Sequence, residues 1–121
     1  MRITLCGSAR FEGAFHEWNK KLTLAGHTVY ALAVYPSFME GNKNWYNEDQ
    51  KTLLDLVHLD KISNSEAIVV IDVDEYYGDS TKREIAWARI QNKIVYWITP
   101  HSKNLKDNAF NKDCWAGILL G

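Results

Sequence analysis

The sequence is poor in cysteine and proline. Only two cysteines, Cys6 and Cys114, occur among 121 residues, and they lie far apart, without the short spacing of a metal-binding motif. This cysteine content is typical of a reduced, cytoplasmic protein, and we expect Cys6 to be a small buried hydrophobic residue. Only Pro36 and Pro100 interrupt the chain, which shows no internal repeat or low-complexity segment.

The sequence also lacks an excess of basic residues and any long apolar run. Fourteen Lys and Arg against fifteen Asp and Glu give a formal net charge of -1, which argues against binding to polymeric nucleic acid. No apolar run approaches the roughly 20 residues of a membrane span. The first residues are typical of a strand and not of a signal peptide. We therefore expect neither a nucleic-acid polymer nor a membrane as partner.

Aromatic residues, in contrast, are abundant, with five Trp, six Tyr and four Phe. Phe11, Phe15 and Trp18 recur at helical spacing, which predicts that they face the core. Other rings fall on predicted loops and form a candidate surface for stacking on a base: Tyr35, Phe38, Trp45, Tyr46, Tyr76 and Tyr77.

Short apolar runs alternate with helical patterns along most of the chain. Strands are predicted at 3–6, 28–34, 67–72 and 94–98, and helices at 11–25, 50–64 and 81–91. This alternation predicts an α/β fold, a flavodoxin-like three-layer sandwich with a parallel sheet of four to five strands. We expect one domain over residues 1–121, although 101–121 is weakly patterned and its run at 114–120 fits either a strand or a helix. Residues 36–50 are predicted to form a long exposed loop of the kind that is often functional.

The first candidate site follows the first predicted strand, where ligands bind in open α/β sheets. Gly7, Ser8 and Arg10 place backbone amides, a hydroxyl and a guanidinium at a strand-to-helix turn, a combination that suits an anion. An ordinary turn in which Ser8 caps the helix fits the same residues equally well. The glycines and lysine of a P-loop or dinucleotide motif are absent.

The second candidate site lies between the third strand and the next helix. Asp72 ends the strand and Glu84 lies near the helix start, and a pair of carboxylates at one edge suits glycosyl transfer. Spacing alone favours a different role for Glu84, a capping box with Thr81. Asp72 has an equally plausible role as a solvated strand end or a cap. Lys82 and Arg83 argue against a cage of metal-binding oxygens here, and we expect no metal site.

His58 lies on the same predicted helical face as two apolar residues, Leu54 and Ile62. A lone histidine in that position is more often a structural residue than a catalyst. We therefore predict a structural role for His58.

Three segments follow one another along the chain: GSARF at 7–11, HLDKI at 58–62 and, after Asp72, YYGDSTKREI at 76–85. Taken in this order, they resemble the nucleoside 2-deoxyribosyltransferase-like superfamily. The resemblance covers roughly residues 1–98 and is nearest to a small branch related to nucleoside 5′-monophosphate N-glycosidases. It implies a flavodoxin-like fold with strand order 2-1-3-4-5. It also implies cleavage or transfer at the N-glycosidic bond of a nucleoside or nucleotide, without a metal or organic cofactor.

The same resemblance implies residue roles. Glu84 would be the nucleophile that forms a covalent glycosyl-enzyme, and Asp72 would orient the sugar hydroxyls or assist the departing base. The residues implied to bind substrate are Gly7, Ser8, Arg10, Tyr77, Gly78, Ser80 and Thr81, of which Ser8, Arg10 and Ser80 match phosphate-holding positions. Unlike the transferases, which place an Asp before the glycine, this chain has Tyr77 before Gly78 and Asp79 after it.

Two further expectations complete the sequence analysis. Members of the superfamily often assemble their site between subunits, so the resemblance implies a homo-oligomer. The alternative to an enzyme is a protein that binds a nucleotide or nucleotide-derived signal in the same cleft without turning it over.

Overall fold

Four parallel strands form one sheet in the computed structural model, which describes residues 1–38 and 46–99. The strands are β1 (Arg2–Gly7), β2 (Thr28–Tyr30), β3 (Ala67–Ile71) and β4 (Ile94–Trp97). Their order across the sheet is β2-β1-β3-β4, and each neighbouring pair is parallel. This arrangement confirms the predicted α/β, flavodoxin-like fold.

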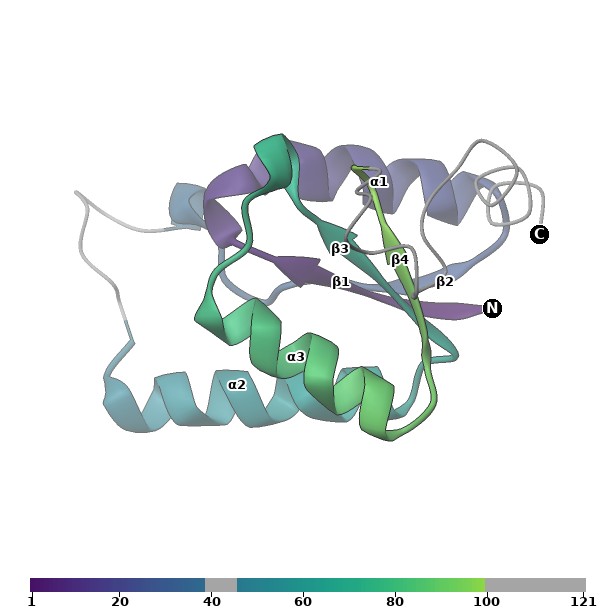
Figure 1. Ribbon diagram of the computed structural model, residues 1–121. Helices are drawn as coiled ribbons and strands as arrows, with labels where there is room; N and C mark the ends of the chain where they lie inside the picture. Colours follow the sequence, from purple (N-terminus) through teal and green to yellow (C-terminus); the bar gives the residue numbers. More distant parts are fainter. Residues whose placement is uncertain (39–45, 100–121) are drawn as a thin grey trace.

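The helices cover both faces of the sheet. Figure 1 shows α1 (Glu12–Leu24) on one face and α2 (Glu48–Ser63) with α3 (Asp79–Ile90) on the other, which makes three layers. Short 3-10 turns follow β1, β2 and β3 at Ala9–Phe11, Pro36–Phe38 and Val73–Glu75. Within the described residues, every helix is too short or too polar to cross a bilayer.

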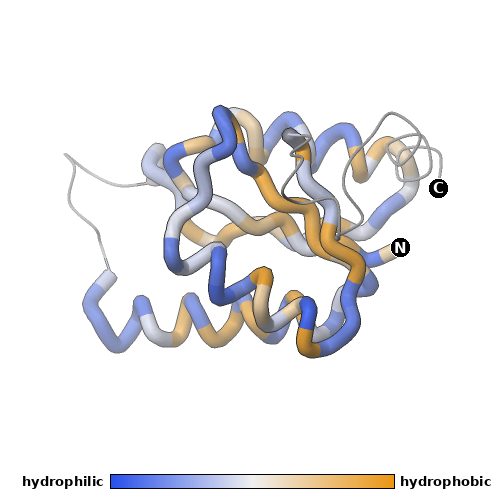
Figure 2. Tube along the Cα trace, in the orientation of Figure 1, coloured by the Kyte–Doolittle hydropathy of each residue, from blue (hydrophilic) through white to orange (hydrophobic). Residues whose placement is uncertain are grey.

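The core lies along the two central strands. All five residues of β3 are buried, as a parallel strand covered by helices on both faces requires. In Figure 2 the apolar colour follows these central strands, while the helices alternate between polar and apolar residues. Phe15 and Leu22 of α1 pack on one face, and Ile62 of α2 with Ile85 of α3 contribute to the same buried cluster.

Element boundaries differ from the prediction at several ends, and two of these differences have a clear cause. β2 ends at Tyr30 instead of residue 34, because it pairs with β1 only from Thr28 to Tyr30. α2 begins at Glu48, two residues early, because Asn47 and Gln50 form a capping box that starts the helix there. The predicted element at 114–120, the tail 101–121 and Trp45 lie outside the described residues.

The start of α3 changes the interpretation of Glu84. Gly78 is the N-cap and Asp79 the first helical residue, so Thr81 is the third residue of the helix instead of its cap. The capping box that the spacing of Thr81 and Glu84 favoured is therefore not formed. Glu84 is the sixth residue of the helix and therefore lies beyond its first turn.

Candidate active site

A cavity of about 340 Å³ opens where β1 ends and α3 begins. Its volume falls in the range of small-molecule sites. Six of the nine residues predicted from the sequence line it: Gly7, Ser8, Gly78, Ser80, Thr81 and Glu84. Residues of α2 also line it, namely Lys51, Leu54, Asp55, Val57, His58 and Lys61. Further lining comes from Ala9, from residues 32–34 after β2, from Asp79 and from the rings of Tyr46 and Tyr76. The structure thus brings the two candidate segments to one site.

Gly7 fixes the floor of the cavity. It has a φ of +149°, and a Cβ built on it would lie 2.8 Å from the carbonyl oxygen of Ile71 on β3. A Cβ atom essentially never approaches another heavy atom that closely, so only glycine allows β1 and β3 to end this close together. The close approach lets the chain turn from β1 into the segment that carries Ser8.

Glu84 is the most perturbed acid of the cavity. Its side chain is 14% exposed, and its Oε2 is buried without a hydrogen-bond partner in the described part of the chain. Burial, reinforced by the negative charge of Asp55, raises the pKa of Glu84 to about 8, against the opposing effect of Arg83. A buried carboxyl with an unsatisfied oxygen at a cavity costs stability, a pattern that is frequent at functional sites.

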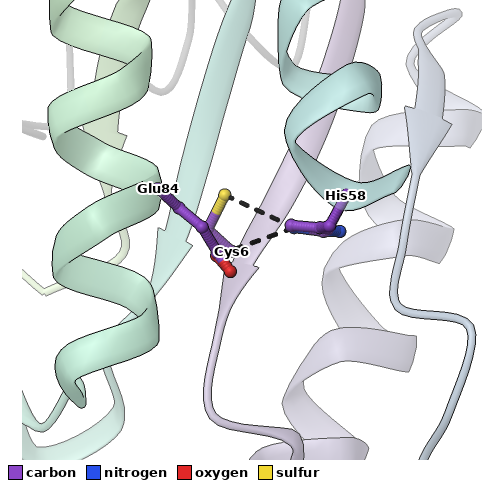
Figure 3. Close-up of side chains that lie close together, drawn as sticks. All are labelled: Cys6, His58 and Glu84. Carbon is purple, nitrogen blue, oxygen red and sulfur yellow. Dashed lines mark hydrogen bonds and ion pairs between the residues drawn. The ribbon is translucent and has the colours of Figure 1, made fainter. Parts of the chain in front are cut away.

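Cys6 and His58 lie beside this carboxyl, each on a different element. Figure 3 shows Cys6 from β1, His58 from α2 and Glu84 from α3 pointing toward one another. The His58 Nε2 atom is 3.8 Å from the Cys6 sulfur and 3.7 Å from Glu84 Oε2. Burial lowers the pKa of His58 to about 4, so its ring is neutral at pH 7. Burial and then the charge of Glu84 raise the pKa of the Cys6 thiol, which is therefore protonated.

The sequence analysis did not predict this cluster. Cys6 is buried as predicted, but it also touches the candidate nucleophile. His58 is buried on the predicted apolar face and hydrogen-bonds the Leu5 backbone, yet its ring also faces Glu84. The position of Cys6 could have indicated its role, because Cys6 lies directly before Gly7, at the carboxyl end of a strand that was already a candidate site.

Asp72 does not line the cavity. It is fully buried, and its Oδ1 accepts a hydrogen bond from the Thr99 backbone N–H at 3.1 Å. The Thr99 hydroxyl donates to the Asp72 carbonyl at 2.9 Å. These contacts tie the end of β3 to the segment after β4. Of the two carboxylates expected to share one cleft, only Glu84 reaches it.

The remaining predicted site residues lie at the edge of the cavity or behind it. The Ser8 side chain accepts a hydrogen bond from the Arg10 N–H at 3.4 Å, so Ser8 caps the turn and also lines the cavity. The Arg10 guanidinium stacks on the Tyr76 ring, 3.9 Å from its centre, without lining the cavity itself. Tyr77 packs against Trp97, with ring centres 5.2 Å apart.

The aromatic residues divide between core and cavity. Tyr35 is buried against Phe15, so its predicted place on a stacking surface is wrong. Tyr46 and Tyr76 do line the cavity. Phe15 is buried and Phe11 and Trp18 are partly buried against the same cluster, as predicted.

Comparison with known proteins finds similarity at the level of structure only. No family model matches the sequence, and no curated protein matches it significantly. A 2-deoxyribosyltransferase from Bacillus psychrosaccharolyticus superposes with a TM-score of 0.66 at 15% identity, over 98% of this chain and 90% of that one. The CMP N-glycosidase BcmB from Clostridium botulinum gives 0.56 at 18% identity, over 87% of this chain and 74% of that one. The chain thus shares its fold with these two enzymes, and that fold is the one that the sequence resemblance implied.

Proposed function

We propose that this protein cleaves or transfers at the N-glycosidic bond of a nucleoside or nucleoside 5′-monophosphate, with Glu84 as the nucleophile. The observation that carries the proposal is the Glu84 carboxyl, buried at the cavity with one oxygen that has no hydrogen-bond partner among the described residues. The fold shared with an N-glycosidase and a deoxyribosyltransferase supports the same bond as the target.

The chemistry requires an ionised Glu84. Its oxygen attacks the anomeric carbon while the bond from that carbon to the base nitrogen breaks, and the electron pair leaves with the base. The base takes up a proton from solvent, and a glycosyl ester remains on Glu84. Water then attacks the same carbon and loses a proton to solvent, which frees the sugar and restores the carboxylate. A second base in place of water completes a transfer instead.

The cavity lining suits the other parts of such a substrate. The hydroxyl-bearing residues Ser8 and Ser80 lie along one side, and Lys51 and Lys61 lie on α2, so a phosphate has donors and cations available. Tyr46 and Tyr76 offer ring faces for a base, and the Arg10 guanidinium on Tyr76 adds positive charge at the rim. We propose that Ser8, Ser80 and Thr81 contact the substrate directly and that Arg10 acts through Tyr76.

The test is release of free base from purified protein. A panel of purine and pyrimidine nucleosides, deoxynucleosides and their 5′-monophosphates is incubated with the wild type, Glu84→Ala and Glu17→Gln, and free base is measured by chromatography. Glu17 is the matched control because it lies on the exposed surface of α1, paired with Lys21 at 2.8 Å. We expect release by the wild type and the control, and none by Glu84→Ala.

A nucleophile also leaves a direct signature. Added formate should partly restore base release by Glu84→Ala, because a small carboxylate can occupy the vacated space. Mass spectrometry of the wild type quenched during turnover should show a chain heavier by one sugar residue. Base release by Glu84→Ala at the wild-type rate would contradict the nucleophile. Tight binding of an intact nucleotide without any base release would instead establish the non-catalytic alternative.

Assembly into a homo-oligomer stays a prediction. One observation bears on where a second copy would sit. Leu53, Leu56 and Val57 form an apolar strip on α2 and are 60%, 57% and 52% exposed. Val57 also lines the cavity, so a second copy on this strip would border the site. Light scattering of the wild type and of Leu56→Glu measures whether a dimer forms and whether this strip holds it.

A further inference from the structure

We propose that Cys6, His58 and Glu84 form a binding site for one divalent cation of borderline softness, with the preference of Zn²⁺. The three residues offer a sulfur, a nitrogen and an oxygen, and these ligand atoms all lie within 4.8 Å of one another. A thiolate, an imidazole and a carboxylate are the ligand types that Zn²⁺ takes in proteins.

The two distances from His58 are near those of a tetrahedral centre, and the Cys6 sulfur and the Glu84 oxygen lie within 4.8 Å of each other. Bonds of about 2.0 to 2.3 Å place neighbouring ligand atoms roughly 3.3 to 3.6 Å apart around zinc. The nitrogen of His58 lies 3.8 Å from the sulfur of Cys6 and 3.7 Å from the oxygen of Glu84. Shifts of a few tenths of an ångström would therefore bring these neighbours to bonding geometry.

The surroundings also suit a metal. The ligands come from β1, α2 and α3, three elements of the packed fold, so their positions are held by the core. The contact of the His58 ring with the Leu5 backbone orients the imidazole, as second-shell hydrogen bonds do at zinc sites. Glu84 Oε2 has no hydrogen-bond partner in the described part of the chain, and a cation would satisfy it. The cavity lies beside the cluster and leaves room for a fourth ligand, such as water.

Binding at this site has a consequence for the proposed function. A cation coordinated by Glu84 occupies the oxygen that would attack the anomeric carbon, so metal and substrate should exclude one another. This consequence rests on the proposed function, but the metal site itself does not. The ligand set escaped the sequence analysis because Cys6 and His58 are 52 positions apart and meet only in the fold.

The test uses Co²⁺ as a spectroscopic probe with the full chain, free of any affinity tag and stripped of metal. We expect one Co²⁺ per chain, visible absorption of a tetrahedral ion and a near-ultraviolet band from thiolate-to-metal charge transfer. Zn²⁺ should abolish both signals at a ratio of one to one. Cys6→Ala should lose the charge-transfer band, and His58→Gln and Glu84→Gln should each weaken binding at least 100-fold.

Matched controls are Cys114→Ser, which removes the other cysteine, and His16→Gln, which removes an exposed histidine of α1. Both should bind Co²⁺ like the wild type. If Cys6→Ala does not fold, as judged by its thermal transition, Glu84→Gln at the cavity carries the test. Absence of a thiolate band in the wild type, or equal binding by Glu84→Gln, would overturn the site.

Base release separates this proposal from the proposed function. If both hold, Zn²⁺ inhibits the wild type and a chelator restores it. Co²⁺ binding without base release from any substrate would uphold the metal site and contradict the enzyme. Base release that saturating Zn²⁺ leaves unchanged, together with no Co²⁺ spectrum, would contradict the metal site and uphold the enzyme.

Discussion

Two buried carboxyl groups near the same edge of the sheet have opposite surroundings. Asp72 at the end of β3 is fully buried and accepts a hydrogen bond from the Thr99 backbone. Glu84 on α3 is partly buried beside a cavity and has an oxygen with no hydrogen-bond partner in the described chain. A satisfied buried acid stabilises the fold, whereas an unsatisfied one costs stability and is available to a ligand. The comparison teaches that position at a strand end does not by itself make an acid functional.

The largest expected difference between Glu84 and Asp72 is in the rate of base release. We expect Glu84→Gln to lower the rate of base release about 1,000-fold or more, because an amide cannot act as the nucleophile. Asp72→Asn keeps an oxygen for the Thr99 N–H and should stay within about tenfold of the wild type. Single-turnover kinetics on the best substrate of the panel measures both. A loss in Asp72→Asn as large as that in Glu84→Gln would show that Asp72 acts in the reaction.

For the free energy of unfolding we expect the opposite order, with Asp72 more important than Glu84. Asp72→Ala leaves the partly buried Thr99 N–H without its Asp72 acceptor, so we expect the free energy of unfolding to fall by about 1–2 kcal/mol. Asp72→Asn should recover most of that loss. Urea denaturation followed by circular dichroism gives the values. If Asp72→Ala unfolds like the wild type, the hydrogen bond from Thr99 does not stabilise the fold.

The raised pKa of Glu84 predicts a pH-dependent effect on stability. The pKa is about 8 in the folded chain against an ordinary 4.5, so only the folded state holds the proton between these values. Stability contributed by Glu84 therefore falls as the pH rises from 4.5 to 8. Glu84→Gln should equal the wild type near pH 4 and exceed it by about 4 kcal/mol at pH 8. Urea denaturation at the two pH values tests this, and a difference independent of pH would contradict the raised pKa.

The same pKa predicts the dependence of rate on pH. Attack requires the ionised carboxylate, so base release should increase about tenfold per pH unit below about 8 and level off above it. The charged and titratable groups that face Glu84 are Cys6, Lys51, Asp55, His58 and Arg83. Asp55→Asn removes a charge that raises the pKa and should move the profile to lower pH. A profile that falls between pH 6 and 8 would contradict an ionised nucleophile.

The smallest effect is expected from the second contact of Thr99. Thr99→Val keeps the backbone N–H that Asp72 accepts but removes the hydroxyl that donates to the Asp72 carbonyl. We expect a loss of about 1 kcal/mol in the free energy of unfolding and no change in base release. The same urea series measures it. A larger effect on rate than on stability would connect this end of the sheet to the site.

More of the fold than of the candidate site could be predicted from the sequence. The alternation of strands and helices gave the layers, and the buried run of β3 identified the central strand. The predicted start of α2 was wrong because the Asn47 cap begins the helix two residues earlier than the apolar spacing indicated. For Glu84, the spacing from Thr81 favoured a cap because the true N-cap, Gly78, has no side chain to reveal it.

The roles of Asp72, Cys6 and His58 could not be predicted for a different reason. Each depends on a contact between residues distant in sequence, and periodicity carries no information on such contacts. Asp72 directly follows its strand, which ends one residue earlier than predicted, and the Thr99 backbone that binds it lies 27 residues later. His58 shares a face with apolar neighbours, and only the packing of α2 beside α3 shows that Glu84 lies opposite.

The glycine at the end of β1 limits how this cavity can change. Any larger residue at position 7 would push β1 away from the Ile71 carbonyl, so the floor is fixed by backbone and not by a side chain. Substitutions that alter the size or charge of the cavity must therefore come from its walls, above all from α2, where Leu54 and Lys61 line it. Proteins that share this close contact between β1 and β3 can differ in the molecule they accept, because the residues of the cavity walls can change while the backbone at Gly7 stays the same.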